Sequence, residues 1–380
     1  MNAHKKMKIL TVVGTRPEII RLAATIKRLD RETEHVLVHT GQNYDYELNE
    51  VFFEDLGLRK PDHFLGVDTS SLGAVLGSVL THIESVLIAE RPDAMVVLGD
   101  TNSCISAVMA KRLHIPVYHM EAGNRSFDEN VPEEVNRRLV DHVSDYNLVY
   151  TEHARRNLLA EGIHPARILL TGSPMREVLD ANHDAIAASD VLQRQNLSAG
   201  EYFLVSMHRE ENVDNPRRLA TALATLQELA RYYSVPVLVS THPRTRKQLE
   251  NQSADTKKDL IFHPPFGFHD YVKLQKSAKL VLSDSGTISE ESAILAFPAV
   301  SLRDAIERPE ALDTGVTITT GVETESVLDA VRITLDQWAA DGVASTPAEY
   351  DITDTSRRVV NFIRSTVATH HARRGIRRTE

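Results

Sequence analysis

Three glutamates near a predicted loop and helix start are the residues whose types and spacing best suit chemistry. Glu121 follows the apolar run 117–120, and Pro132 opens a predicted helix whose first turn holds Glu133 and Glu134. Carboxylates at a strand end and at a nearby helix start can exchange protons with a bound substrate. An acidic first turn is also common in surface helices, so this segment alone leaves both interpretations open.

The same predicted helix carries arginines beside those carboxylates. Residues four apart share a helix face, so Glu133 should align with Arg137, and Glu134 with Arg138. Arginine beside a carboxylate suits an anionic ligand, which makes Arg137 a candidate substrate-binding residue. We expect an apolar stripe elsewhere on the helix to supply its buried side: Val135, Leu139, Val143 and Tyr146.

A turn of small polar residues supplies a second candidate site. Ser285, Gly286 and Thr287 follow a predicted strand and open a helix. Free backbone N–H groups and the helix dipole make such a start an anion site, and Gly286 lets a phosphate approach closely. Glu290 or Glu291, over a turn further on, could accept hydrogen bonds from ribose hydroxyls. A plain serine N-cap explains the same pattern without a phosphate.

Composition limits the class of protein. The chain has 380 residues, enough for about two domains, with the 42% hydrophobic and 25% charged content of a soluble globular protein. A net charge of −10 argues against nucleic acid as the main partner. No segment approaches about 20 apolar residues, so we expect no membrane span. The only cysteine, Cys104, excludes an intramolecular disulfide and fits a reducing cytoplasm.

Familiar cofactor and metal motifs do not occur in the sequence. There is no Walker motif and no Gly-x-Gly-x-x-Gly, which argues against P-loop hydrolysis and dinucleotide redox chemistry. The 17 histidines show no His-Glu-x-x-His spacing, and one cysteine cannot form a paired-cysteine site. We therefore expect neither a cofactor nor a metal.

Short β-rich runs alternate with helical patterns along the chain, which predicts an α/β fold with parallel sheets covered on both faces. Between two series of strands lies a helical stretch from about Met175 to Gln195. A further helix should begin at Pro17, with an inner stripe of Ile19, Ala23, Ile26 and Leu29. The predicted strands are Met7–Val13, His35–His39, Ala94–Leu98, Val117–Met120, Tyr146–Tyr150, Tyr202–Met207, Val237–Ser240, Leu260–His263, Leu280–Leu282 and Ala299–Leu302.

Polar segments follow many of these predicted strands. In open α/β sheets, ligands bind beyond the carboxyl ends of the strands. Turn formation alone does not readily explain so many polar segments at one edge of two sheets. They are Gly14–Glu18, Thr40–Gln42, Gly99–Thr101, Glu121, His208–Glu210, His242–Arg244 and Ser283–Thr287.

Six motifs occur in order over nearly the whole chain: Val13–Glu18, Gly99–Thr101, Glu121–Gly123, Pro132–Arg137, His208–Glu210 and Ser283–Gly286. Together they resemble the non-hydrolysing UDP-N-acetylglucosamine 2-epimerases. The resemblance implies a glycosyltransferase-B architecture: Rossmann-like domains at 1–175 and 176–355, a cleft between them, and a C-terminal helix with a basic tail, 356–380, that returns to the first domain. It also implies a homodimer.

The resemblance implies a reaction at C2 of a UDP-N-acetylhexosamine, by elimination of UDP to a bound glycal and its re-addition. It implies acid–base roles, not assigned individually, for Asp100, Glu121 and Glu133, and a place near the diphosphate for His208. Preorganised donors aimed at developing negative charge are usually a large part of catalysis. The implied UDP contacts come from Arg16 and the Ser285–Thr287 amides at phosphate, Glu291 at ribose, and the segment from Phe266 to Phe268 around uracil.

One branch of this family is more similar still, the enzymes that form UDP-N-acetyl-L-fucosamine from its L-talo epimer for surface polysaccharides. Arg21 stands where the UDP-N-acetylglucosamine enzymes have lysine, and its rigid fork should hold the sugar or phosphate differently; an exposed helix charge is the alternative. The branch-like stretches are Gly14–Leu22, His39–Leu48, Asp100–Cys104, Asn124–Asn130, Arg137–Tyr146 and Pro265–Asp270.

Other functions share this fold. A UDP-N-acetylglucosamine/UDP-N-acetylmannosamine 2-epimerase is the first alternative, and a hydrolysing epimerase is a further one. A retaining glycosyltransferase has less use for three carboxylates at one sugar carbon. A non-catalytic UDP-sugar sensor would have no use for an intact Asp100, Glu121 and Glu133.

Overall fold

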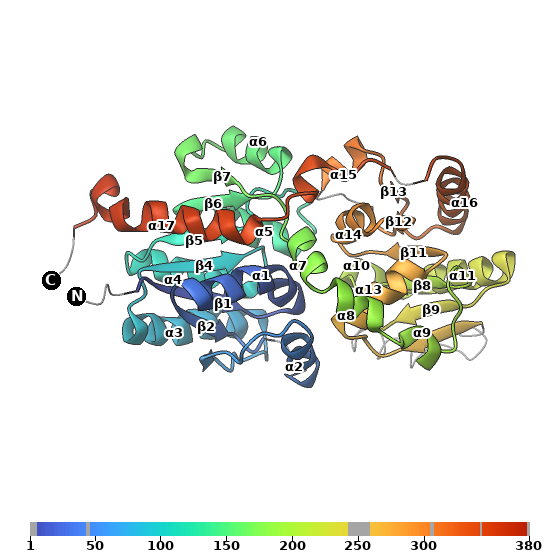
Figure 1. The fold of residues 1–380 in the computed structure, drawn as a ribbon, viewed down its shortest axis with the longest axis horizontal. Coiled ribbons are helices and arrows are strands. Elements are labelled where there is room, and N and C mark those ends of the chain that lie inside the picture. Colours follow the sequence, from blue (N-terminus) through green and yellow to red (C-terminus); the bar gives the residue numbers. More distant parts are fainter. Residues whose placement is uncertain (1–5, 43–45, 242–258, 305–307, 343, 378–380) are drawn as a thin grey trace. The chain divides into compact units, whose positions relative to one another are not determined.

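The computed structural model describes residues 6–42, 46–241, 259–304, 308–342 and 344–377 (Figure 1). The predicted polar segment His242–Arg244 lies outside these residues. The chain forms two compact units. Unit 1 comprises Met1–Ala181 with Glu349–Glu380, and unit 2 comprises Asn182–Ala348. The sequence places the corresponding boundaries at 175 and 355.

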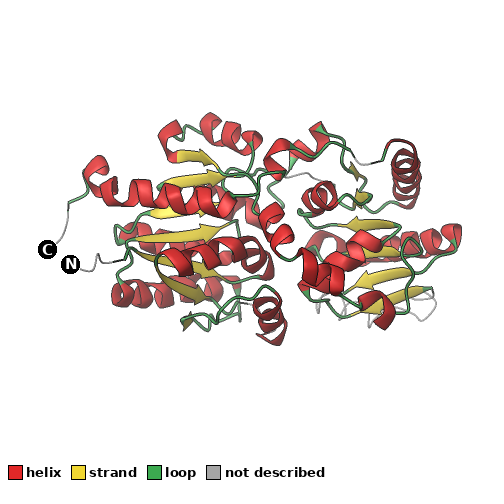
Figure 2. Cartoon of the chain, viewed as in Figure 1, coloured by secondary structure: helices red, strands yellow, loops and turns green. Residues whose placement is uncertain are grey.

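Unit 1 is built on a parallel sheet with the strand order β3-β2-β1-β4-β5-β6-β7, and Figure 2 shows strands in yellow and helices in red. Its strands are β1 Lys8–Val13, β2 Glu34–His39, β3 His63–Phe64, β4 Ala94–Leu98, β5 Val117–Met120, β6 Tyr146–Val149 and β7 Ile168–Leu170. Its helices are α1 Arg16–Glu32, α2 Tyr46–Asp55, α3 Leu72–Glu90, α4 Ser106–Arg112, α5 Pro132–Val143, α6 Glu152–Ala160, α7 Met175–Ala181 and α17 Thr355–Arg374. The parallel α/β prediction is confirmed, although β3 and β7 were not predicted.

The β1–α1 connection shows how local sequence forms this unit. β1 is buried over nearly its full length, as its apolar, β-branched run predicts. Thr15 and Glu18 form a capping box at the start of α1, and Pro17 fits the first turn because it lacks an N–H that would need a partner. The predicted inner stripe of α1 is buried, and α1 packs against α7 and α17.

Unit 2 repeats the architecture with the strand order β10-β9-β8-β11-β12-β13, again parallel. Its strands are β8 Phe203–Ser206, β9 Val237–Ser240, β10 Leu260–His263, β11 Leu280–Ser283, β12 Ala299–Ser301 and β13 Ile318–Thr319. Its helices are α8 His183–Ala188, α9 Val191–Arg194, α10 Glu210–Val213, α11 Pro216–Tyr233, α13 Phe268–Ser277, α14 Ile288–Leu295, α15 Pro309–Asp313 and α16 Thr324–Asp341.

Two expectations need correction. The predicted helical stretch 175–195 is three short helices, α7, α8 and α9, and the boundary between the units falls between the first two. The expectation that no segment is long and apolar enough to cross a membrane overlooks α3, whose 19 residues pass that test by length and composition. Polar residues such as His82 and Glu84 interrupt its apolar run in the sequence. One such helix is weak support for a membrane span, because core helices pass the same test.

Candidate active site

Asp100 lies just beyond the carboxyl end of β4, where it is held from α5. Arg137 directs Nη2 and Nε at the same Asp100 oxygen, at 2.5 and 3.1 Å. The side chain of Asn136 donates to the backbone carbonyl of Asp100 at 3.0 Å. Asp100 is therefore fixed through both its side chain and its backbone, and its carboxylate faces a buried guanidinium.

Glu121 follows β5 in a conformation that costs energy. Its φ is +65°, in the left-handed region that non-glycine residues rarely adopt. Arg21, which is 2% exposed, donates to the Glu121 carboxylate at 2.9 Å, and its guanidinium also lies 5.6 Å from the Tyr150 ring. A strained backbone of this kind persists where its surroundings enforce it, as they often do at functional sites. The alternative of Arg21 as an exposed helix charge is wrong.

The two adjacent glutamates in the first turn of α5 have different environments. Glu134 is buried and accepts from the amide and hydroxyl of Ser126, from Arg137 and from Arg138. Burial acts to raise the pKa of Glu134, but the Ser126 amide and the Arg137 charge outweigh it and hold that pKa low. Glu133 is partly exposed. Protein groups therefore hold the Glu134 carboxylate, whereas Glu133 is partly accessible from solvent.

The predicted buried stripe of α5 is wrong. Val135 and Leu139 are 66% and 40% exposed, and Tyr146 belongs to β6. The buried residues of α5 are Glu134, Arg137, Val140 and Asp141. The helix turns this polar face inward because the loops after β4 and β5 offer carboxylates, carbonyls and amides that satisfy it.

Beneath these loops lies a buried ionic cluster that sequence reasoning missed. Asp141 is fully buried, 2.8 Å from Nη1 of Arg125 and 2.9 Å from Nδ1 of His119. It also accepts from the amide of Gly123 at 3.2 Å, while Nε2 of His119 lies 2.8 Å from the carbonyl oxygen of Gly99. The cluster thus ties the loop after β4 to the loop after β5. Gly123 is required there, because at its φ of +82° a Cβ would lie 2.4 Å from a backbone oxygen.

Glu18 also joins two loops, at the carboxyl ends of the neighbouring strands β1 and β4. Its buried carboxylate accepts from the amides of Gly14 and Thr15, at 2.9 and 2.7 Å, and from the hydroxyls of Thr15, Thr101 and Ser103. Burial raises the pKa of Glu18, although these hydrogen bonds act to lower it. Glu18 therefore joins the loop before α1 to the loop that contains Asp100.

Cys104 belongs to the same buried cluster. Its thiol donates to the Leu98 carbonyl at 2.7 Å. Burial, together with the charges of Glu18 and Asp100, raises the pKa of this thiol well above its usual range.

In unit 2, the predicted anion-binding turn lies between β11 and α14. The Ser285 and Thr287 hydroxyls lie 2.9 Å apart, and the Thr287 amide donates to the Ser285 hydroxyl at 3.3 Å. The N-cap of α14 is Thr287, so the plain serine N-cap is wrong. Glu291, in the first turn of α14, accepts from Gln275 at 2.5 Å.

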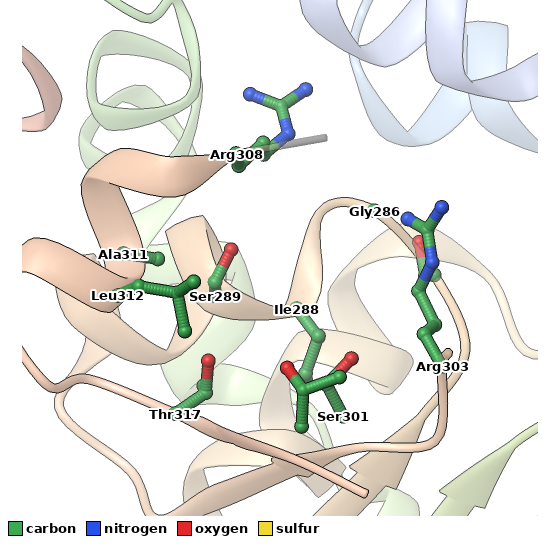
Figure 3. A pocket seen from close by; sticks show the side chains of 11 residues that line it. Gly286, Ile288, Ser289, Ser301, Arg303, Arg308, Ala311, Leu312 and Thr317 are labelled. Carbon is green, nitrogen blue, oxygen red and sulfur yellow. The ribbon is translucent and has the colours of Figure 1, made fainter. Parts of the chain in front are cut away.

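A small open pocket lies beside this turn, lined in part by Ser285, Gly286 and Ser289 (Figure 3). Arg303 and Arg308, 4% and 5% exposed, lie on either side of the Gly286 loop in the figure. Nη1 of Arg308 is 3.4 Å from the Glu290 carboxylate. Sequence reasoning missed both arginines, although they follow β12 at the same edge of the sheet as the serine turn.

The remaining predicted residues lie on several elements. Arg16 begins α1, with its guanidinium 5.7 Å from the ring of Phe52. Phe266 is buried and stacks on His263 with ring centroids 3.9 Å apart, and Phe268 is buried at the start of α13. His208 follows β8, with its side chain 44% exposed and Nδ1 3.2 Å from the Asp284 carboxylate.

The chemistry available therefore differs between the units. Unit 1 presents carboxylates oriented by arginines, which suits proton transfer. Unit 2 presents amides, hydroxyls and arginines at the start of a helix, which suits an anion. Within the described part of the chain, no group of three or more histidine, cysteine, aspartate or glutamate residues could hold a metal ion.

Several known proteins are similar to this chain. The family model described as UDP-N-acetylglucosamine 2-epimerase matches residues 27–364. The structure of a UDP-N-acetylglucosamine 2-epimerase from Rickettsia bellii superposes with a TM-score of 0.90 at 44% identity, covering 96% of this chain and 98% of that one. The Methanocaldococcus jannaschii UDP-GlcNAc 2-epimerase, solved in complex with UDP-GlcNAc and UDP, gives a TM-score of 0.88 at 36% identity, over 94% and 100% of the chains.

A relative with a different named substrate is also similar. The UDP-2,3-diacetamido-2,3-dideoxy-D-glucuronate 2-epimerase of Pseudomonas aeruginosa is 34% identical, over 88% of this chain and 94% of its own length. The glycotransferase of kitacinnamycin, at 11% identity and a TM-score of 0.57 over 95% and 99% of the chains, shares the fold alone. The glycosyltransferase-B-like fold class is thereby confirmed, and the relatives differ in the sugar that their names specify.

Proposed function

Because the chain belongs to the UDP-N-acetylglucosamine 2-epimerase family, and is thus a UDP-sugar 2-epimerase and a non-hydrolysing isomerase, we propose which sugar it converts and which residues act. The proposed reaction converts UDP-2-acetamido-2,6-dideoxy-L-talose to UDP-N-acetyl-L-fucosamine for surface polysaccharide synthesis. The observation that carries this choice is Arg21, buried between Glu121 and Tyr150. Lysine cannot make both of these contacts in the same way, since its ammonium is a single point of charge.

The proposed chemistry is an elimination followed by a re-addition. A carboxylate removes the proton from C2 while the bond from C1 to the UDP oxygen breaks, and the C1–C2 double bond of a glycal forms. UDP then adds back to C1 as a carboxylic acid delivers a proton to the opposite face of C2. We propose Asp100, Glu121 and Glu133 as the groups that exchange these protons, without assigning each role.

We propose that unit 2 binds the nucleotide part of the substrate. The Ser285–Thr287 amides with Gly286 would hold phosphate, Glu291 would hold ribose, and Phe266 and Phe268 would frame uracil. Support comes from the pocket beside Gly286 and its two buried arginines, of which Arg308 is a further phosphate candidate. His208 would assist departure of the diphosphate. In unit 1, we propose that Arg16 contacts phosphate and that Arg21 and Arg137 lie on the sugar side of the substrate.

UDP-N-acetylglucosamine is the second candidate substrate. It is the sugar in the names of the Rickettsia and Methanocaldococcus enzymes, and it is bound in the structure of the latter. A pocket shaped for the 6-methyl group of the L-sugar should reject a hydroxymethyl group only moderately unless polar contacts also differ. The two candidates therefore have to be separated by measurement.

The test is turnover of both UDP-sugars in deuterium oxide, followed by NMR of C2. Deuterium should enter C2 of the product while the UDP linkage survives, and kcat/KM should favour the L-sugar. Efficient use of UDP-N-acetylglucosamine with no turnover of the L-sugar would overturn the substrate proposal. Complete retention of the original hydrogen would overturn the elimination route. Activity should survive EDTA, since arginines and amides neutralise the diphosphate in this proposal.

We also propose that the enzyme is a homodimer. Support comes from unit 1, where α3 leaves Leu72 and Ile88 66% and 54% exposed and α5 leaves Val135 exposed. Sedimentation equilibrium should give twice the chain mass of 42.4 kDa. A monomer at micromolar concentration would overturn this proposal.

A further inference from the structure

Asp284 is a buried carboxylate at the edge of unit 2 that also holds His208. It follows β11, which pairs in parallel with β8, the strand before His208. Asp284 is fully buried, whereas the His208 side chain is 44% exposed. A buried carboxylate needs N–H or O–H partners, and here they come from the loop that follows β8.

The two oxygens of Asp284 have different partners. Oδ2 accepts from the amides of His208 and Arg209, both at 3.0 Å, and from the Asn212 side chain at 3.1 Å. Oδ1 lies 3.1 Å from the His208 amide and 3.2 Å from Nδ1 of the His208 ring. One oxygen therefore holds the backbone of the loop, and the other also faces the imidazole.

A carboxylate can only accept hydrogen bonds, so a ring nitrogen that faces it is favoured in its N–H form. We propose that Asp284 is the positioning residue that keeps a hydrogen on Nδ1 of His208 and leaves Nε2 as the nitrogen that exchanges a proton with the substrate. This inference rests on the proposed function for the part played by the substrate.

The ring gives one proton to the substrate and takes it back. As the C1–O bond breaks, a proton that Nε2 has taken up from solvent moves to an oxygen of the departing diphosphate, and it returns to Nε2 when UDP adds back. Nδ1 keeps its hydrogen throughout. Asp284 thus holds the orientation and the tautomer of the ring, as the buried aspartate of a catalytic triad does for its histidine.

The alternative is that Asp284 only holds the loop together. Asp284→Asn separates the two roles because the two oxygens differ. With its carbonyl oxygen at the Oδ2 position, asparagine keeps the acceptor for three N–H donors. Its NH2 group then faces Nδ1 of His208 and favours a ring without hydrogen there. Asn212→Ala is the matched control, since it removes a loop contact to Oδ2 and leaves Oδ1 facing the ring.

The experiment measures the His208 tautomer by long-range 15N–1H NMR of the full-length protein labelled with 15N-histidine. The signal is assigned by its loss in His208→Gln. We expect Nδ1–H in the wild type and in Asn212→Ala, and Nε2–H in Asp284→Asn. The kcat of Asp284→Asn should fall by about 10²-fold or more, with UDP still bound.

A neutral Nε2–H ring in the wild type would overturn the inference, as would an unchanged tautomer in Asp284→Asn. A tautomer change equally large in Asn212→Ala would reduce Asp284 to a structural role and overturn it too. The tautomer is read without substrate. It therefore tests the contact separately from the proposed function, which fails if the wild type converts UDP-N-acetylglucosamine efficiently and the L-sugar not at all.

Discussion

The two units place opposite kinds of groups at equivalent edges of similar sheets. In unit 1, the candidate proton-exchanging side chains already face cations: Asp100 contacts Arg137, and Glu121 contacts Arg21. In unit 2, the Gly286 turn presents amides and hydroxyls, with buried arginines beside it. A diphosphate supplies its own negative charge, whereas a carboxylate that exchanges protons must be held by the protein before substrate arrives.

Both units nevertheless fix the loops at these edges in the same way, with a buried carboxylate. Each has a fully buried carboxylate that joins two neighbouring strand-end loops. Glu18 accepts hydrogen bonds from the loops after β1 and β4, whereas Asp284 lies after β11 and accepts from the loop after β8. Glu18 takes three of its hydrogen bonds from hydroxyls, whereas Asp284 takes amide N–H groups and faces an imidazole. In both units the buried carboxylate positions the loops. The hydrogen-bond donors to Glu18 and Asp284 differ, in line with the different chemistry proposed for each unit.

The largest expected effect tests whether proton transfer by unit 1 is separate from nucleotide binding by unit 2. Asp100→Asn, Glu121→Gln and Glu133→Gln keep the shape of the side chain but cannot shuttle protons, so each should lower kcat by about 10²–10⁴-fold. Calorimetry should still detect UDP binding in all three variants. If UDP binding falls in parallel with kcat, the separation between the units is wrong. Normal turnover in all three variants would leave the carboxylates with a structural role only.

The buried charges of unit 1 should also dominate its stability. Asp141→Asn leaves Arg125 with a buried charge that is only partly compensated, which should lower the free energy of unfolding by about 3–5 kcal/mol. The matched control is Asp180→Asn, which breaks an exposed pair with Arg176 and should cost no more than about 1 kcal/mol. Urea unfolding of both variants measures this difference. Equal losses in the free energy of unfolding would show that the buried cluster contributes no more than an exposed ion pair.

In unit 2, the expected effect is on binding. Ser285→Ala combined with Glu291→Ala removes a hydroxyl from the proposed anion-binding turn and a carboxylate from α14. UDP affinity should weaken by about 2–4 kcal/mol through lost hydrogen bonds. Isothermal titration calorimetry checks this, and an unchanged dissociation constant would place the nucleotide elsewhere.

The smallest effect concerns pH and a histidine at the end of β2. Burial lowers the pKa of His39 from 6.5 to about 4. The folded state therefore resists protonation, so its stability is intact above pH 6.5 and is lost progressively as the pH falls toward 4. Between pH 7.5 and 5 the wild type should lose about 2 kcal/mol more than His39→Gln. Urea unfolding at both pH values measures this difference, and parallel pH profiles would contradict it.

The sequence predicts the strands and α1 well because backbone propensity and burial agree there. Val117–Met120 and Val237–Ser240 are apolar runs in sheets covered on both faces, and they are observed with the predicted bounds. The short edge strands β3, β7 and β13 were missed, since two or three residues carry too little pattern to distinguish them from loops.

The candidate site was predicted in part. The strand-end rule brings Asp100 and Glu121 to one edge of unit 1, but it does not show which first-turn glutamate of α5 is buried. The stripe on α5 was wrong because apolar periodicity assumes an apolar partner, and α5 instead packs on charged loops. Arg303, Arg308 and Asp141 are recognisable only from burial, which depends on long-range packing.

Cys104 has a practical consequence, since it is the only cysteine in the chain. The thiolate is the reactive form of cysteine, and the environment near Glu18 and Asp100 disfavours it. A thiol reagent should therefore modify the native protein only when the loop after β4 opens. The labelling rate would give the free energy of that opening, and Cys104 lies in unit 1. The chain thus contains a natural reporter for local unfolding beside the proposed acid–base residues, with no need for an introduced probe.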